Sequence, residues 1–291
     1  MVVAFVLILV AVGTVAFHFL SPWWWTPIAS NWGYVDDTII ITFWITGVVF
    51  IVIIFFMAYC VYRYRHQPGR RATYEPENKK MEWWLTGLTA VAVAALLTPG
   101  LFVWDQFITV PEDAAEFEVV AQQWLFTYRF PGKDGVLGTS DSQNISPENP
   151  FGLNSNDPNG LDDILVESDE VHLPLDKPVK VLLRSIDVLH DFYVPQFRAK
   201  MDMVPGTVTY FWFTPTKTGT FDVLCFELCG IGHYTMRGSV VVVVESAYQE
   251  WLAEQPTFAE LSAQAGNGAG EDFTPALSEA EADTVERVSA Q

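Results

Sequence analysis

The apolar positions of this chain are gathered in its first third, in three long runs almost free of charged residues. The runs cover residues 1–20, 38–62 and 81–104. A helix rises 1.5 Å per residue, so about 20 apolar residues are enough to cross the hydrocarbon core of a bilayer. The pattern predicts a transmembrane helix over 1–20, followed by a transmembrane helix hairpin over 38–104.

The first run lacks the features of a cleaved signal peptide. No Lys or Arg precedes Arg63, and no clear Ala-x-Ala pattern follows the run. A cleaved signal normally has both a basic start and a small-residue cleavage site. We therefore expect residues 1–20 to be retained, as a transmembrane helix or as an uncleaved signal anchor.

The short loop between the second and third runs is strongly basic. It contains six basic residues, Arg63, Arg65, Arg70, Arg71, Lys79 and Lys80. Such loops stay on the cytoplasmic side of the membrane. The chain after residue 104 then emerges on the opposite, periplasmic side. This predicts a multi-pass protein of a bacterial-type inner membrane, with lipid around its helices.

Beyond residue 104 the pattern changes to an alternation of apolar and polar positions. The strands it predicts lie at 117–130, 179–185, 207–215, 220–225 and 239–245. Several short strands separated by turn residues are typical of a β-sandwich or Greek-key barrel. We therefore expect a membrane-anchored all-β protein, with N-terminal transmembrane helices followed by a β-sandwich domain over 105–250.

Two parts of the second half do not follow the strand pattern. Residues 131–163 are rich in Gly, Asn, Asp, Ser and Pro, which predicts a turn-rich insertion. Its acidic part, 154–163, loosely resembles a calcium loop, but the closing Glu of an EF-hand is not in place. Residues 251–291 begin at the end of a short expected helix and are read as a flexible acidic tail.

Charge is distributed unevenly along the chain. The net charge is −19, and 30 of the 35 acidic residues, but only 10 of the 16 basic ones, lie from Asp105 onward. This excess repels nucleic-acid phosphates and excludes nucleic acid as a partner. It favours a basic protein partner drawn in by electrostatic steering, unless the acidity serves only solubility.

The candidate chemistry lies in one stretch of twelve residues, 225–236. It contains Cys225, Cys229, His233 and Met236, and a further histidine, His190, lies upstream. Thiolate, imidazole and thioether ligands suit copper, and a blue-copper site uses one of each plus a second histidine. The additional cysteine changes this picture. Two thiolates on one loop can each bridge two metals, so the pattern predicts a dinuclear copper centre.

Two other interpretations of the cysteines remain open. Cys225 and Cys229 could form a disulfide in an oxidising compartment, and two Cys with two His would suffice for zinc by number. The spacing of Met236 and the glutamate between the cysteines favour copper. The third cysteine, Cys60, lies inside an apolar run, and no Cys-x-x-Cys-His motif for c-type haem is present.

The loop, together with Ser185-x-Asp187-x-x-His190, resembles subunit II of the haem–copper cytochrome c oxidases from about residue 37 to about residue 250. This resemblance implies a cupredoxin-like sandwich that carries a copper A centre. It implies that both cysteines bridge the coppers and that His190 and His233 each bind one copper. It assigns the two weak positions to Met236 and to the backbone carbonyl of Glu227. The Glu227 side chain would reach a magnesium ion at the contact with subunit I.

The resemblance also implies two roles outside the loop. Trp124, in Gln123-Trp124-Leu125-Phe126-Thr127-Tyr128, matches the tryptophan through which electrons enter from cytochrome c. The family has aromatic residues where this chain has Leu125, so the docking surface differs in detail. Glu82 matches a glutamate at the mouth of a proton path into subunit I.

The function implied is that of the subunit through which electrons enter a proton-translocating cytochrome c oxidase. Reduced cytochrome c would dock on the acidic face, and electrons would continue to the haem of subunit I, where oxygen is reduced. This chain would have no oxygen-reducing site of its own. Two alternatives remain: the copper A subunit of a nitric oxide reductase, and a membrane-anchored copper delivery protein.

Overall fold

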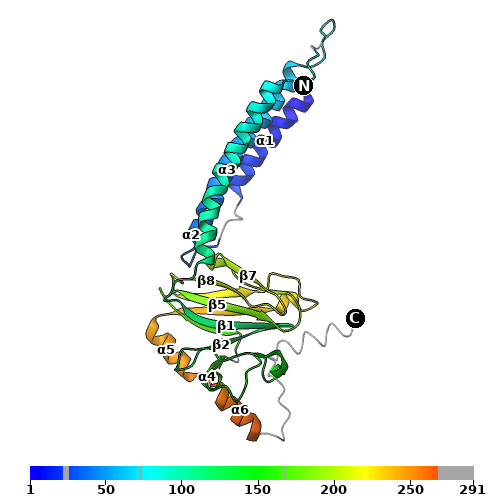
Figure 1. Ribbon diagram of the computed structural model, residues 1–291. Coiled ribbons are helices and arrows are strands. Elements are labelled where there is room, and N and C mark those ends of the chain that lie inside the picture. The colour runs from blue at the N-terminus through cyan, green and yellow to red at the C-terminus, as the bar shows by residue number, and fades with distance from the viewer. Residues whose placement is uncertain (22–25, 72–73, 167, 268–291) are drawn as a thin grey trace.

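The protein consists of a rod of long helices standing on a β-sandwich (Figure 1). The computed structural model describes residues 1–21, 26–71, 74–166 and 168–267 of the 291-residue chain. N-terminal apolar helices followed by a sandwich of two sheets confirm the predicted fold class.

Three helices form the rod, and each is long and apolar enough to cross a membrane. They are α1 (Val2–Leu20), α2 (Gly33–Arg63) and α3 (Lys79–Ile108). Their side chains are largely exposed, as expected for helices that face lipid or other subunits. Both α2 and α3 extend past the predicted runs 38–62 and 81–104, because their polar end turns keep helical geometry outside the apolar stretch.

The sandwich contains two five-stranded sheets. The first has the order β3-β2-β1-β5-β8 and the second β4-β10-β9-β6-β7. Within the sheets, β1–β5 and β10–β4 are parallel pairs, and the other pairs are antiparallel. The strands are β1 (Ala115–Gln122), β2 (Leu125–Phe130), β3 (Ile164–Val166), β4 (Glu170–Pro174), β5 (Val179–Ser185), β6 (His190–Val194), β7 (Ala199–Met203), β8 (Thr209–Phe213), β9 (Gly219–Leu224) and β10 (Arg237–Val243).

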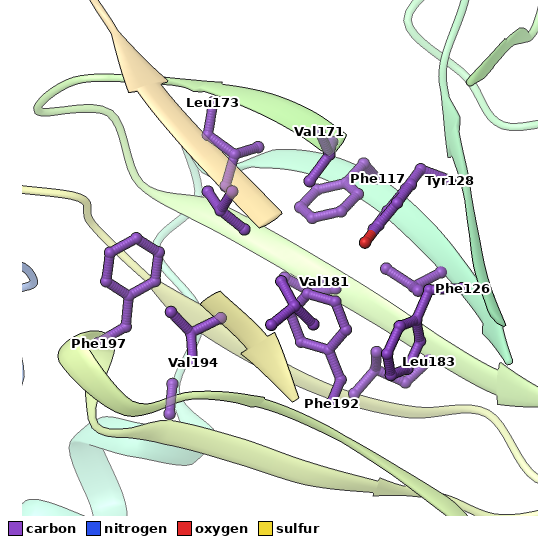
Figure 2. Packing of buried hydrophobic residues seen from close by; sticks show 14 of the residues in the cluster. Phe117, Phe126, Tyr128, Val171, Leu173, Val181, Leu183, Phe192, Val194 and Phe197 are labelled. Atoms are coloured by element: carbon purple, nitrogen blue, oxygen red, sulfur yellow. The ribbon is translucent and has the colours of Figure 1, made fainter. Parts of the chain in front are cut away.

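The core between the sheets is built from alternating strand positions and is rich in aromatic rings. In β5, Val179, Val181 and Leu183 are buried while their neighbours are half-buried. Rings from both sheets meet across the core, as between Phe126 and Phe192 (Figure 2). Large aromatic side chains bury much apolar area each, so the strands that carry the functional loops are held rigidly.

The structure corrects one predicted strand. Residues 117–130 are not a single strand but the hairpin of β1 and β2, which turns at Gln123 and Trp124. Apolar residues continue through the turn, so the sequence pattern alone does not reveal it. Strands β3, β6 and β7, of three to five residues, are not among the strands predicted from the alternation.

The segment before α2 fastens the helices to the sandwich. Trp32 is fully buried and its indole N–H donates to the Trp212 carbonyl at 2.9 Å. The Arg198 guanidinium donates to both carboxylate oxygens of Asp36, at 2.6 and 2.9 Å. The end of α3 is fastened as well, since the Trp212 indole N–H donates to the Gln106 carbonyl at 3.1 Å. The sandwich therefore has a fixed position at the end of the helical rod.

The predicted insertion, 131–163, packs on the sheet instead of lying loose. It includes the short helix α4 (Pro158–Leu161), and its Phe151 and Leu153 are buried against Val120. A network of charged residues anchors it, because Arg129 binds Glu118 and Asp163 and all three are almost fully buried. Arg184 adds a second ion pair to Glu118 and donates to the Phe151 carbonyl.

The chain after β10 differs only in part from the expectation of a short helix followed by a flexible tail. The short helix is α5 (Glu245–Glu254), but a second helix, α6 (Phe258–Asn267), follows it, and Phe258 packs into the same cluster as Phe151. The tail prediction is therefore wrong for 251–267, while 268–291 lie outside the described residues.

Removing the charge of Arg129 should destabilise the sandwich strongly. Arg129→Met leaves Asp163 buried without its cationic partner and leaves Glu118 with Arg184 alone, which costs about 3–5 kcal/mol. Lys180→Gln breaks the more exposed pair with Glu116 and should cost no more than about 1 kcal/mol. Denaturant unfolding of the full chain in detergent measures both. Equal losses for the two variants would contradict the structural role of the network.

The pKa of Asp163 makes the same network sensitive to pH. Burial raises the pKa of this carboxyl to about 6, although Arg129 acts in the opposite direction. The folded chain then holds a proton that the unfolded chain releases near pH 3.8, so the free energy of unfolding falls as the pH rises from about 4 to 6.

Asp163→Asn should remove this dependence. The difference in unfolding free energy between the natural chain and the variant should change by up to about 3 kcal/mol over that interval and level off above pH 6. A difference that stays flat between pH 4 and 6, or has the opposite slope, would show that Arg129 keeps Asp163 ionised.

Candidate metal centre

The loop 225–236 joins β9 to β10, and its two ends lie side by side. Leu224 and Arg237 are paired across the two strands, and the Cys225 N–H donates to the Met236 carbonyl at 3.2 Å. A turn of 3₁₀-helix over His233–Thr235 leads back into β10. The loop is therefore closed at its base, and the side chains of Cys225 and Met236 begin at adjacent points.

Closing the loop brings the predicted donors together. The sulfur atoms of Cys225 and Cys229 are 3.7 Å apart. The Nδ1 atom of His190 is 3.9 Å from the Cys225 sulfur, and that of His233 is 3.5 Å from the Cys229 sulfur. The Met236 sulfur lies 3.9 Å from the Cys229 sulfur. All three predicted side-chain types, thiol, imidazole and thioether, thus lie together at this loop.

The second weak donor is also in place. The carbonyl oxygen of Glu227 lies 3.3 Å from the Cys225 sulfur, whereas the Met236 sulfur is next to the Cys229 sulfur. The arrangement is symmetrical in kind: each sulfur has one imidazole nitrogen and one weak donor next to it.

His190 is oriented by a carboxylate. It is the first residue of β6 rather than part of the preceding loop, and it is fully buried. Its Nε2 lies 2.8 Å from Asp187 Oδ1, so its Nδ1 points to the sulfur atoms. Metal-binding histidines commonly bind a carboxylate with their other nitrogen, which fixes the ring.

Asp187 is itself held by backbone donors. The N–H groups of Gln123 and Val188 donate to its two oxygens, each at 2.6 Å. Burial acts to raise the pKa of Asp187, but these bonds and His190 lower it overall. Asp187 is therefore a carboxylate. Burial acts to lower the pKa of His190, but Cys225 and Asp187 together raise it.

The two thiols differ in acidity. Burial acts to raise the pKa of Cys225, but His190 and the backbone N–H of Asp191 bind its sulfur and lower the pKa to about 6. Burial and the neighbouring Cys225 raise the pKa of Cys229 to about 12. The first thiol is thus ready to bind metal as thiolate, while the second loses its proton when a cation is present.

This donor set fits two copper ions better than the alternatives. The sulfur atoms are free thiols, and 3.7 Å is far beyond the disulfide bond length of about 2.05 Å. A zinc ion uses four ligands, whereas six donors meet here, including a thioether and a carbonyl that suit copper. Among the described residues, His190, Cys225 and Cys229 are also the only group of three metal-binding side chains. The acidic loop 154–163 therefore gains no support as a calcium site.

Trp124 lies against the loop. Its indole N–H donates to the Cys229 carbonyl at 3.2 Å, and a Cβ atom on Gly232 would come within 2.3 Å of its ring. The Gln123 side chain donates to the same carbonyl at 2.7 Å. Only glycine at 232 permits the ring to lie this close, so the tryptophan is in direct contact with the backbone of a metal donor.

Glu82 is distant from the metal donors. It lies in the first turn of α3, at the end away from the sandwich (Figure 1). The 26 residues from Glu82 to Ile108 correspond to about 39 Å of helix. The predicted site residues therefore form one cluster around the loop and one separate position at the far end of the helices.

Asp187 and Gln123 were part of the motifs recognised in the sequence, but no role was predicted for them. Asp187 lies three residues before His190, a spacing that could have suggested a carboxylate partner. Gln123 is 64 residues from Asp187 and 106 from Cys229, so only the folded chain brings it to both.

Comparisons with known proteins agree with this geometry. The family model described as cytochrome c oxidase subunit II, periplasmic domain, matches residues 116–246. The chain is 66% identical over 262 residues to the alternative cytochrome c oxidase subunit 2 of Bradyrhizobium diazoefficiens, covering 90% of this chain and 95% of the relative. It is 28% identical over 240 residues to cytochrome c oxidase subunit 2 of Cereibacter sphaeroides, covering 79% and 77%.

Among solved structures, the chain is similar to the periplasmic domain of subunit II of cytochrome oxidase from Bradyrhizobium japonicum. The TM-score is 0.37 at 26% identity, over 50% of this chain and 95% of that one. The assignment rests on the sequence relatives, which extend over nearly the whole chain. The sandwich is thus the cupredoxin-like periplasmic domain of a membrane-anchored subunit, and the chain belongs to the family of subunit II of the haem–copper cytochrome c oxidases.

Proposed function

We propose that this chain accepts electrons from cytochrome c at a dinuclear copper A centre and passes them to the haem of subunit I. There oxygen is reduced, coupled to proton translocation. The observation that carries the proposal is the pair of thiol sulfurs 3.7 Å apart, with one imidazole nitrogen next to each. Such a pair is suited to bridging two metal ions.

The ligand roles follow from the contacts around the sulfur atoms. Cys225 and Cys229 would bridge, His190 and His233 would each hold one copper, and Met236 and the Glu227 carbonyl would be the weak ligands. Two coppers sharing one electron through bridging thiolates supply a redox site whose geometry changes little on reduction.

The protein contributes rigidity and exclusion of water. The exposed fraction is 7% for Cys225 and 2% for Cys229, and Met236 and His190 are also buried, while His233 is half-buried. The donors lie on a closed loop between two paired strands. A rigid and dry site limits reorganisation of the surroundings when its charge changes.

Trp124 would provide a short electron-transfer path into this buried site. Its indole ring lies on Gly232, and its N–H is bound to the Cys229 carbonyl, which belongs to a bridging residue. An electron that reaches the half-buried ring is therefore one hydrogen bond away from the backbone of Cys229. This contact supports Trp124 as the residue through which electrons enter.

The surroundings support the proposed partners. Thirty acidic residues from Asp105 onward favour docking of a basic cytochrome c. The loop also exposes apolar side chains, Phe226, Leu228 and Ile231, which is typical of a surface that contacts another protein. Contact with subunit I at this loop would place the Glu227 side chain where a magnesium ion could be shared between the subunits.

The membrane part supports the remaining proposals. The basic loop between α2 and α3 supports a cytoplasmic position for that end of the helices in a bacterial-type cell, and three crossings would then leave the sandwich in the periplasm. Glu82 then lies at the cytoplasmic surface, a position from which protons could enter subunit I.

Two other functions are less well supported. A copper A nitric oxide reductase would use a similar subunit, and the difference would lie in its partner. A copper delivery protein needs a site that releases metal, whereas six buried or half-buried donors on a closed loop favour retention. The 66% identity to a relative named as an oxidase subunit favours the oxidase.

The dinuclear centre can be tested on the full chain purified in detergent and loaded with copper. We expect two coppers per chain and a seven-line hyperfine pattern in the EPR spectrum, since one electron is shared by two nuclei. Cys229→Ser removes one bridge and should give a four-line mononuclear signal. Cys60→Ser is the matched control and should keep seven lines. A four-line signal from the natural chain, or no copper uptake, would contradict the proposal.

The role of Trp124 can be tested by Trp124→Phe. This variant loses the indole N–H and shifts the ring, so electron transfer from cytochrome c to the copper-loaded chain should slow about 10- to 100-fold. The EPR spectrum should stay dinuclear. Trp251→Phe, in which the replaced ring stacks on His172 away from the loop, is the control and should keep the natural rate. Equal rates in the two variants would remove Trp124 from the electron path.

A further inference from the structure

The turn between β1 and β2 lies between the two loops that carry the metal donors. One of its residues, Gln123, contacts both. Its backbone N–H donates to Asp187 Oδ2 at 2.6 Å, and its side-chain amide donates to the Cys229 carbonyl at 2.7 Å. Asp187 binds His190 through its other oxygen, at 2.8 Å. A continuous series of hydrogen bonds thus leads from His190 through Asp187 and Gln123 to Cys229.

We infer that Gln123 is a positioning residue, which sets the place of the His190 imidazole relative to the cysteine loop. This inference rests on the proposed copper centre, because it concerns how two ligand loops are held for the same metals. Gln123 itself contacts no metal donor atom in the structure. It acts through Asp187 on one side and through the Cys229 carbonyl on the other.

The sheet alone holds these two loops together only weakly. His190 opens β6, and the cysteine loop follows β9. The register between β6 and β9 contains a single residue pair, Tyr193 with Leu224. By contrast, β9 and β10 are paired over six positions. The base of the cysteine loop is therefore well fixed to β10, while its position relative to His190 depends on additional contacts.

The contact between the turn and the loop is built into the backbone of the loop. Gly230 has a φ of 118°, and a Cβ atom at this position would lie 2.8 Å from the Gln123 amide nitrogen. A side chain there would be strained and would also displace the amide. Glycine at 230 therefore serves the approach of Gln123, as glycine at 232 serves that of Trp124.

The Gln123 side chain contributes little to the core. Gln123 is exposed at the tip of the hairpin, so its replacement removes no buried apolar contact. Its neighbour Gln122 is half-buried and makes no side-chain hydrogen bond within the described part of the chain. The same substitution at Gln122 and at Gln123 therefore separates the effect of the hydrogen bond made by Gln123 from the effect of replacing a glutamine.

The test uses the full chain in detergent, loaded with copper. Gln123→Glu keeps the shape but removes the donor and turns an oxygen toward the Cys229 carbonyl. Gln123→Leu removes the donor without adding charge, and Gln122→Glu and Gln122→Leu are the controls. We expect both Gln123 variants to bind copper about 3- to 10-fold more weakly, the effect of losing one hydrogen bond, as measured by competition with a chelator. Their EPR hyperfine splittings should shift, whereas those of the Gln122 variants should match the natural chain.

A double variant tests the link between the loops. Asp187→Asn disturbs the contact with His190, and Gln123→Leu removes the contact with the Cys229 carbonyl. If Gln123 joins them, the losses in copper affinity are not additive, because either change alone already releases His190 relative to the loop. Additive losses would mean that the two contacts act separately and would overturn the inference.

The outcomes distinguish this inference from the proposed function. A seven-line spectrum from the natural chain, with Gln123 and Gln122 variants alike in affinity and spectrum, overturns the role of Gln123 and leaves the copper centre intact. Failure of the natural chain to form a dinuclear centre overturns the proposed function itself. Thermal unfolding of the metal-free variants completes the test. Loss of the fold in both Gln123 variants would count against the inference, because Gln123 would then serve the sandwich rather than the centre.

Discussion

The hydrogen bond from the Cys225 N–H to the Met236 carbonyl is the contact on which the rest of the site depends. It closes a twelve-residue loop at the point where β9 ends and β10 begins. It extends the pairing of β9 with β10 by one step, to the first and last donors of the loop. With it, the two sulfur atoms, the imidazole of His233 and the thioether start from one rigid base. The strands on either side are held by an aromatic core, so the stability of the sandwich is transmitted directly to the metal donors.

The same dependence continues outward to the membrane. The sandwich is joined to the helices by the buried Trp32 and by the two hydrogen bonds from Arg198 to Asp36. The Trp212 indole N–H binds the end of α3 at the same junction. Because these contacts fix the sandwich on the rod, the distance from the metal donors to the membrane is a property of the fold. The proposed transfer of electrons to a haem inside the membrane would require such a fixed distance.

The amino-acid sequence was sufficient for the parts of this arrangement that are local. Four of the candidate metal donors lie within twelve residues, Cys225, Cys229, His233 and Met236, so their spacing alone predicts a metal site. The helices are equally local, since length and apolar character define them. The remainder depends on contacts between distant residues. The sequence does not reveal the turn at Gln123, because apolar residues continue through it. It also does not predict α6, whose place depends on the packing of Phe258 in the same cluster as Phe151. The bonds from Gln123 to Asp187 and Cys229 bridge 64 and 106 residues, which no local pattern predicts.

The site has to meet two opposing requirements. Under the proposed function the metal donors need burial, since water around them would reorganise at each change of charge, yet the electron would have to arrive from a protein outside. The structure meets both by bringing a large ring up to the backbone instead of opening the loop. The absence of side chains at Gly230 and Gly232 makes room for Gln123 and Trp124, and both donate to the single carbonyl of Cys229. One carbonyl therefore joins the ring proposed for electron entry, the turn that binds Asp187, and the backbone of a proposed bridging cysteine. This explains why the loop has glycines at the very positions where a rigid metal site would otherwise benefit from larger residues.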